Sequence, residues 1–186
     1  MKAAFYVQNP NIQPEDGELP KIGRWMAAGF RRMRDLYIPM RECSFDEMIA
    51  GFKGRCRFLF DKMKKPTSSG LKVFGYCESK TGFVLDGEVD QRNKRSIKSF
   101  ILDLARRCFP KKSGHMIYMD YLFVSPGNLT LMLTYGLHAC GTWRGNYGVP
   151  DDLKEANNKK KEKGWWIWRI IKDGAWHLTA YAWQVL

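Results

Sequence analysis

The spacing of apolar residues changes once along this chain, and the change limits the folds that it can adopt. Between residues 44 and 89, apolar and polar side chains alternate in short runs, as on strands with one buried face. In residues 96–109 the apolar positions recur at helical spacing instead, as at Ile97, Ile101 and Leu104. Further strand, helix and strand patterns follow. The chain is therefore predicted to adopt an α/β fold with a mixed sheet and flanking helices.

Glycine, proline and capping residues divide the chain into the expected elements. Pro39 ends the first expected helix. Ser125 is a suitable N-cap for the third expected helix, and Gly136 is suited to end that helix. Asp173 with Gly174 is a strong hairpin signal between two Trp-rich strands. Helices are expected over residues 24–37, 96–109 and 126–135, a loop or frayed helix over 151–164, and strands over 44–52, 55–60, 70–79, 82–89, 116–119, 138–143, 165–172 and 175–183.

The charge balance suggests an acidic partner. Lys and Arg total 31 and Asp and Glu total 19, a net charge of +12, and nucleic acid is the commonest partner of a soluble protein with this excess. No signal peptide or membrane-spanning run is present, which predicts an intracellular protein without a membrane partner. Five widely separated cysteines without metal-ligand spacing are expected to be reduced thiols: Cys43, Cys56, Cys77, Cys108 and Cys140.

Two aspartates interrupt apolar strand patterns. Asp46 lies within the first expected strand, and Asp120 directly follows the apolar run at residues 116–119. Such residues are commonly structural, at a strand end or turn. If the two strands are neighbours, however, both carboxylates project into one place, where a divalent cation offsets their repulsion. Oxygen ligands favour magnesium or manganese, the metals of phosphoryl-transfer sites on nucleic acids.

Basic and aromatic residues each allow two interpretations. A cluster of Lys or Arg is usually a solvated surface, and the alternative is contact with DNA phosphates. This applies to Arg34 in the first expected helix, to Arg107 in the second, and to the lysines of residues 159–163. The Trp-rich hairpin is expected to pack on the core, with base stacking as the alternative. The candidate DNA contacts are Lys53, Arg55, Arg57, Lys64, Lys65, Lys72 and Arg144.

Several motifs occur in an order that resembles the catalytic region of piggyBac-type transposases. The first strand carries "FDEMIAGFKGR", and "KKP" precedes the strand that begins "GLK". The strand ending at Asp120 is followed by F-x-S-P at residues 123–126, then by "CGTWR" and "VPDDLK". The resemblance covers roughly residues 40–183, and residues 90–112 match less well. It divides the chain into a lead-in (1–40), a partial catalytic core (41–143) and an insertion segment with the hairpin (144–186).

The resemblance implies an RNase H-like fold and DNA transposition. The family uses three aspartates to bind two Mg²⁺ ions, which promote cleavage of DNA at transposon ends and strand transfer into target DNA. Asp46 matches the first of these aspartates and Asp120 the second. Nuclear localisation, a homodimer, transposon-end DNA and target DNA are implied in the same way.

Two departures from the family pattern bear on activity. Tyr121 stands where the family usually has asparagine, and the third aspartate of the family lies downstream of the Trp-rich segment, beyond Leu186. The chain is therefore expected to be a transposable element-derived protein that lacks full transposase activity. The alternatives are a DNA-binding protein that has lost catalysis and a decayed fragment without a molecular role.

Overall fold

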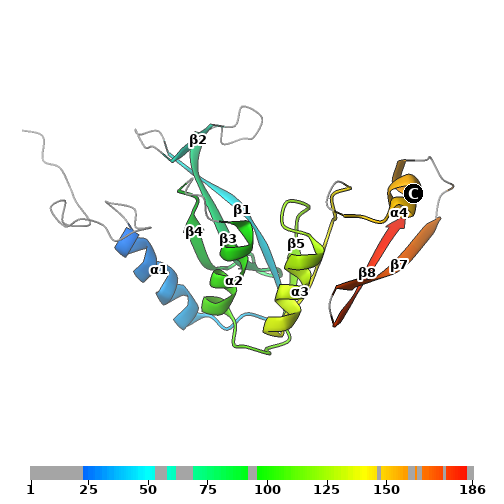
Figure 1. Cartoon of the computed structure of the whole chain (residues 1–186). Helices are drawn as coiled ribbons and strands as arrows, with labels where there is room; N and C mark the ends of the chain where they lie inside the picture. The colour runs from blue at the N-terminus through cyan, green and yellow to red at the C-terminus, as the bar shows by residue number, and fades with distance from the viewer. Residues whose placement is uncertain are drawn as a thin grey trace, which may run out of the picture. The chain divides into compact units, whose positions relative to one another are not determined.

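The computed structural model of the 186-residue chain forms two compact units, Met1–Phe109 and Pro110–Leu186 (Figure 1). The residues that it describes are 23–52, 58–61, 69–91, 96–145, 148–158, 162, 165–173 and 175–183. The first unit contains α1 (Gly23–Leu36), β1 (Glu42–Gly51), β2 (Leu59–Asp61), β3 (Ser69–Glu78), β4 (Val84–Val89) and α2 (Ile97–Cys108). The second contains β5 (Met116–Met119), α3 (Pro126–Tyr135), β6 (His138–Gly141), α4 (Asp151–Asn158), β7 (Trp166–Asp173) and β8 (Trp176–Trp183).

Strand β3 is the centre of the sheet in the first unit. It pairs antiparallel with β1 along one side, from Cys43 opposite Glu78 to Gly51 opposite Gly70. Along its other side it pairs antiparallel with β2 near its start and with β4 near its end. The alternating sequence over residues 44–89 accounts for this sheet, because neighbouring residues of a strand project to opposite faces.

Helices α1 and α2 cover opposite faces of this sheet. On one face, Phe74 packs against Phe100 of α2, with ring centroids 5.0 Å apart. On the same face the buried Tyr76 hydroxyl donates to the backbone oxygen of Ile101 in α2 over 3.0 Å. On the other face, Val73 lies in an apolar cluster against which Met26 of α1 packs. The first helix is therefore part of the packed unit.

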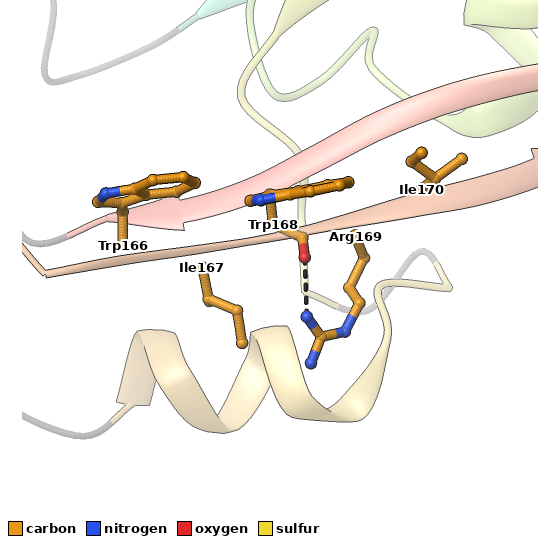
Figure 2. Close-up of a pocket in the computed structure, with 5 residues that line it drawn as sticks. All are labelled: Trp166, Ile167, Trp168, Arg169 and Ile170. Atoms are coloured by element: carbon orange, nitrogen blue, oxygen red, sulfur yellow. Dashed lines mark hydrogen bonds between the residues drawn. The ribbon is translucent and has the colours of Figure 1, made fainter.

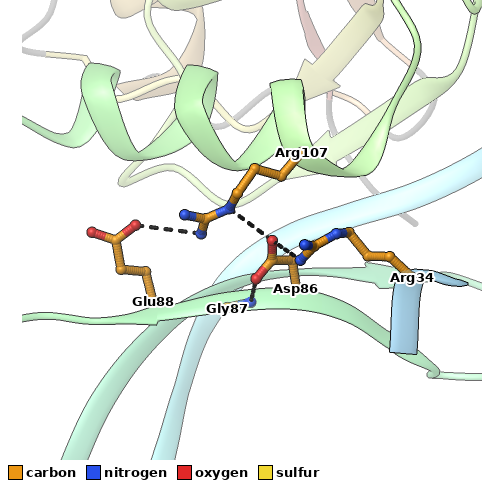
Figure 3. A network of polar contacts seen from close by, with 5 residues as sticks. All are labelled: Arg34, Asp86, Gly87, Glu88 and Arg107. Carbon is orange, nitrogen blue, oxygen red and sulfur yellow. Dashed lines mark hydrogen bonds and ion pairs between the residues drawn. The ribbon is translucent and has the colours of Figure 1, made fainter. Parts of the chain in front are cut away.

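A buried carboxylate joins both helices to the edge strand β4. Asp86 is 1% exposed and accepts hydrogen bonds from Arg34 of α1 and, over 2.8 Å, from Arg107 of α2 (Figure 3). Its other oxygen accepts from the Gly87 backbone N–H over 2.7 Å, and Arg107 also reaches Glu88. The side chain of Arg107 is 41% exposed, as expected for a solvated surface, whereas that of Arg34 is 23% exposed. Both guanidinium groups point toward Asp86, a partner that the sequence did not indicate, and their contact with DNA phosphates stays a prediction.

Glu78 closes the turn between β3 and β4. Its carboxylate accepts hydrogen bonds from the Thr81 hydroxyl over 2.5 Å, from the Thr81 N–H over 2.7 Å and from the Lys80 N–H over 3.1 Å. The Thr81 hydroxyl has the largest effect in lowering the pKa of Glu78, although burial opposes it. The side chain is thus held as a carboxylate that fixes the turn.

The second unit contains a parallel strand pair and a capped helix. β5 pairs with β6 in parallel from Met116 opposite His138 to Met119 opposite Gly141. Ser125 caps α3 by accepting from the Asn128 N–H. Gly136 ends α3 at φ 88°, a left-handed conformation that favours glycine. Both signals for this helix are confirmed, and antiparallel and parallel pairing both occur in the chain, as the sequence predicted.

The C-terminal strands form the expected hairpin. β7 and β8 pair antiparallel from Trp166 opposite Trp183 to Asp173 opposite Trp176. One face of the hairpin packs on α4, where Leu153 and Leu178 are both buried. Arg169 forms an ion pair with Asp152 of α4 over 2.6 Å. Residues 151–158, expected as a loop or frayed helix, form α4 because the hairpin covers its apolar side.

The cysteines in the described part of the chain form no disulfide: Cys43, Cys77, Cys108 and Cys140 are free thiols. Burial raises the pKa of Cys43 to about 12 and that of Cys108 further, so both thiols stay protonated near neutral pH. Cys56 and strand residues 55–57 lie outside the described residues. No helix within the described ranges is long and apolar enough to cross a bilayer. The domain boundaries at residues 40 and 143 stay a prediction.

Candidate functional site

Asp46 projects from the middle of β1 toward solvent. Its neighbour Phe45 is fully buried, so strand alternation directs the Asp46 side chain to the opposite face. The Asp46 Oδ1 atom accepts from the Glu47 backbone N–H over 2.7 Å, which fixes the orientation of the carboxylate. Burial and then the charge of Asp46 raise the pKa of Cys77. Asp46 is therefore an exposed, oriented carboxylate in the middle of a core strand.

Asp120 occupies the carboxyl end of β5, as the sequence predicts. Buried Met119 and Phe123 lie on either side of it along the chain and anchor the turn that it begins. The Asp120 Oδ1 atom accepts from the Tyr121 N–H over 2.6 Å, and its backbone oxygen accepts from the Phe123 N–H over 2.9 Å. The carboxylate is exposed at the end of a parallel strand, a common position for functional residues in α/β folds.

Both carboxylates have the chemistry of a hard-metal ligand. Each uses Oδ1 for a local N–H, and within the described residues neither Oδ2 has a hydrogen bond or ion pair. Oxygen atoms of this kind suit Mg²⁺. No group of three or more His, Cys, Asp or Glu able to hold a metal occurs in the part of the chain that the structure describes. Asp46 and Asp120 belong to different compact units, and their joining in one metal site stays a prediction.

Lys72 has partners within the fold. Its ammonium group lies 2.8 Å from a Glu47 carboxylate oxygen and 4.6 Å from the centre of the Phe74 ring. A phosphate contact by Lys72 would compete with this ion pair, and its DNA role stays a prediction. The other candidates of this cluster lie outside the described residues: Lys53, Arg55, Arg57, Lys64 and Lys65.

Arg144 lies beside the metal-ligand candidate of the second unit. Its guanidinium carbon is 4.1 Å from the centre of the Tyr121 ring, a cation–π contact. The contact fixes Arg144 on the side chain that directly follows Asp120 in the sequence. Tyr121, which replaces the usual asparagine of the resembled family, thus has a structural role that the sequence alone did not indicate.

The hairpin presents aromatic side chains to solvent. Trp166 is 63% exposed and Trp168 is 47% exposed, and Figure 2 shows both indole rings on the same side of β7. Ile167 and Arg169 lie on the other side, toward α4. The expectation that these tryptophans pack on the core is wrong for Trp166 and Trp168. The hairpin packs through the opposite face instead.

A protein-family model described as "Transposase IS4" matches residues 3–180. The chain belongs to the IS4 transposase family. The match spans nearly the whole length of the chain, and it includes both candidate aspartates and most of the hairpin. A search of curated proteins gives no match.

A solved structure supports the fold of the chain. The chain is similar to a piggyBac transposase determined by cryo-EM in a synaptic complex with hairpin DNA, with 23% sequence identity and a TM-score of 0.75. The similarity covers 89% of this chain and 35% of the other, so this chain spans about a third of that protein. The predicted fold class is confirmed: a mixed α/β fold with flanking helices and a C-terminal hairpin.

Proposed function

We propose that this transposase chain binds DNA and supplies two metal-binding carboxylates of a DDE-type catalytic domain, Asp46 and Asp120. The observation that carries the proposal is that both carboxylates are exposed and oriented in a chain that belongs to a transposase family. Asp46 is exposed within β1 and Asp120 directly after β5. Both are oriented by the next backbone N–H, and each has one oxygen without a partner among the described residues. This arrangement suits a ligand for Mg²⁺.

The protein groups contribute orientation and charge. Mg²⁺, when bound, supplies the charge that activates an attacking oxygen and stabilises a leaving oxygen in phosphodiester chemistry. Asp46 and Asp120 would hold the metal, and the N–H groups of Glu47 and Tyr121 keep each carboxylate in one orientation. Two-metal chemistry in the family uses a third aspartate. Strand cleavage is therefore proposed only where a third carboxylate joins these two.

DNA is the proposed partner. The net charge of +12 favours a polyanion, and the similar piggyBac transposase was solved with hairpin DNA. Arg144 is the described basic residue best placed to contact a phosphate near Asp120, because the Tyr121 ring holds it there. Transposon ends and target DNA as ligands, a homodimer and nuclear localisation belong to this proposal.

Metal binding tests the proposal directly. Asp46→Asn and Asp120→Asn are each expected to weaken Mn²⁺ binding at least about tenfold, because each removes one anionic ligand. Isothermal titration of the whole chain with Mn²⁺ measures this effect. Asp151→Asn is the matched control: Asp151 is an exposed aspartate on α4 that pairs with Lys154, and its replacement should leave Mn²⁺ affinity unchanged.

Equal affinity in all three variants would exclude these two aspartates as metal ligands. A loss in only one of them would mean that the two do not share a site. Unfolding measured on the same samples must show that each variant keeps its fold.

Tyr121 is expected to affect DNA binding through Arg144. Tyr121→Leu removes the ring below the guanidinium and should weaken binding to a duplex about threefold, the effect of an exposed cation–π contact. Tyr121→Phe keeps the ring and should bind as tightly as the native chain. Fluorescence anisotropy with a labelled duplex in EDTA provides the measurement. If the phenylalanine variant loses as much as the leucine variant, the hydroxyl and not the ring carries the effect.

A second candidate is a DNA-binding protein without catalysis. The net charge of +12 favours it, because binding of a polyanion needs Lys and Arg and no metal ligand. It predicts salt-dependent DNA binding that survives Asp46→Asn and Asp120→Asn, since Lys and Arg make the contacts. Metal binding that depends on both aspartates would exclude it in favour of the first proposal.

A further inference from the structure

The exposed face of the β7–β8 hairpin has an unusual composition. By strand alternation it carries Trp166, Trp168, Ile170 and Lys172 from β7. Cross-strand pairing places Tyr181 opposite Trp168 on the same face. Trp166, Trp168 and Tyr181 are 63%, 47% and 58% exposed. The face is thus rich in aromatic surface that the described part of the unit leaves open to solvent.

The other face explains why this one stays open. Leu178 is buried against the unit, and Arg169 pairs with Asp152 of α4. In Figure 2 α4 lies on the side of β7 that carries Ile167 and Arg169, and the two indole rings lie on the opposite side. The hairpin therefore needs neither indole for its own packing, although burying one would stabilise the fold. Large exposed aromatic surfaces of this kind mark sites of interaction.

The charged residues on the exposed face of the hairpin indicate a negatively charged partner. Lys172 is exposed, and His177 lies opposite it in register. Thr179 is opposite Ile170, so no Asp or Glu occurs among the described residues of this face. Lys172 and His177 are therefore the basic residues of this face, and the whole chain carries +12. Flat aromatic rings flanked by cations, without acids, bind strands whose bases stack on the rings and whose phosphates meet the positive charge.

The geometry of the two indoles suits successive bases. Residues two apart on a strand are separated by about 6.6 Å, which places Trp166 and Trp168 side by side along β7. Figure 2 shows the two rings edge-on, with their planes along the strand, so the faces of the rings point away from β7. A pocket lined by residues 166–170 lies at the same stretch of the strand. We propose that the three rings of this face, termed the stacking face and defined by Trp166, Trp168 and Tyr181, bind unpaired bases of single-stranded DNA.

This inference rests on the proposed function for the choice of DNA as partner, but it needs neither metal nor strand cleavage. In duplex DNA the faces of the bases are stacked on one another, so they are not available to stack on the aromatic side chains of the hairpin. A single strand exposes them, so stacking favours single-stranded over duplex DNA. Base identity has little influence, because every base has a π face.

The test compares a fluorescein-labelled oligo(dT) strand of about 16 nucleotides, long enough for one such site, with an abasic strand of the same length. Anisotropy is measured on the whole chain in EDTA. Trp168→Ala should weaken binding to oligo(dT) about tenfold, the effect of losing one base–aromatic stack. Trp168→Phe should stay within about threefold of the native chain. The abasic strand, which keeps its phosphates, should bind the native chain and Trp168→Ala equally.

Ile170→Ala is the matched control, because Ile170 lies on the same side of β7 as the two indoles but is outside the stacking face. Ile170 is 55% exposed and has no ring, so its replacement should leave oligo(dT) affinity unchanged. An equal loss for Ile170→Ala and Trp168→Ala would mean general apolar docking and would overturn the proposal. So would a change from dimer to monomer in Trp168→Ala by light scattering, since the face would then join two copies of the chain.

A duplex in EDTA separates this inference from the proposed function. If the native chain binds the duplex but Trp168→Ala binds oligo(dT) as well as the native chain does, only the stacking face is excluded. If the native chain binds neither DNA, both proposals fail. Thermal unfolding of each variant should match the native chain, because the replaced side chains are exposed.

Discussion

Asp86→Ala is expected to lower the free energy of unfolding by about 3 kcal/mol, the cost of removing one partner from a buried ion pair. The substitution leaves the guanidinium groups of Arg34 and Arg107 without their shared carboxylate and removes the tie between α1, α2 and β4. Asp86 is almost fully buried, so water replaces it poorly. Urea unfolding, followed by far-ultraviolet circular dichroism, measures the loss.

Asp103→Ala is the control for Asp86→Ala. Asp103 pairs with Arg106 one turn away on α2 over 3.3 Å, and both side chains are exposed. An exposed pair of this kind contributes less than about 1 kcal/mol. If Asp86→Ala costs no more than this control, the two arginines are solvated in solution and α1 is held by apolar contacts alone.

Gly141→Ala is expected to destabilise the second unit by about 3 kcal/mol, at the upper end for overpacking in a packed region. A Cβ atom at Gly141 would collide with the carbonyl oxygen of Met119 and lie 2.8 Å from Cγ2 of Val124. The collision forces β6 away from the end of β5, where Asp120 follows Met119. We therefore expect Gly141→Ala to weaken Mn²⁺ binding as well as stability.

Gly127→Ala provides the comparison for Gly141→Ala. Gly127 lies in the first turn of α3, and a Cβ atom there would have no neighbour within 4 Å. Alanine in a helix is favoured over glycine, so this variant should be as stable as the native chain or more stable by about 0.5–1 kcal/mol. Urea unfolding of both variants checks the pair. Equal stability of Gly141→Ala and the native chain would show that β5 and β6 separate without cost.

Local patterns predicted the elements well. Ser125, Pro126 and Gly136 defined α3 because each acts through its own backbone and its immediate neighbours. The helical spacing after residue 96 predicted α2, which Ser96 caps by accepting from the Ser99 N–H. Such signals need no knowledge of the rest of the fold.

Side-chain partners were predicted poorly. Asp86 interrupts the apolar run "FVLDGEV" just as Asp46 and Asp120 interrupt theirs, yet only the structure shows that two arginines neutralise it. Arg34 lies 52 residues away along the chain, a separation at which sequence spacing carries no information about contact. The same limit applies to Arg144 and Tyr121, which the turn after β5 brings together.

For the hairpin, too, the sequence predicted the strands and only the structure showed which face is buried. Alternation established that Trp166 and Trp168 share one face of β7, because successive residues of a strand project to opposite sides. It could not establish which face is buried, since both carry apolar residues. Contact with α4 decided this by burying the side of Leu178 and leaving the indoles exposed.

The sequence by itself determined the order of helices and strands, the family, and the two aspartates that interrupt β1 and follow β5. These depend on residue type and on spacing over a few positions. Only the tertiary structure decided which charged residues are neutralised and which face outward, because burial and ion pairing depend on segments far apart in the chain. Asp46 and Asp120 are distinguished from Asp86 on this basis: no arginine reaches the first two within the described residues, whereas two bind the third.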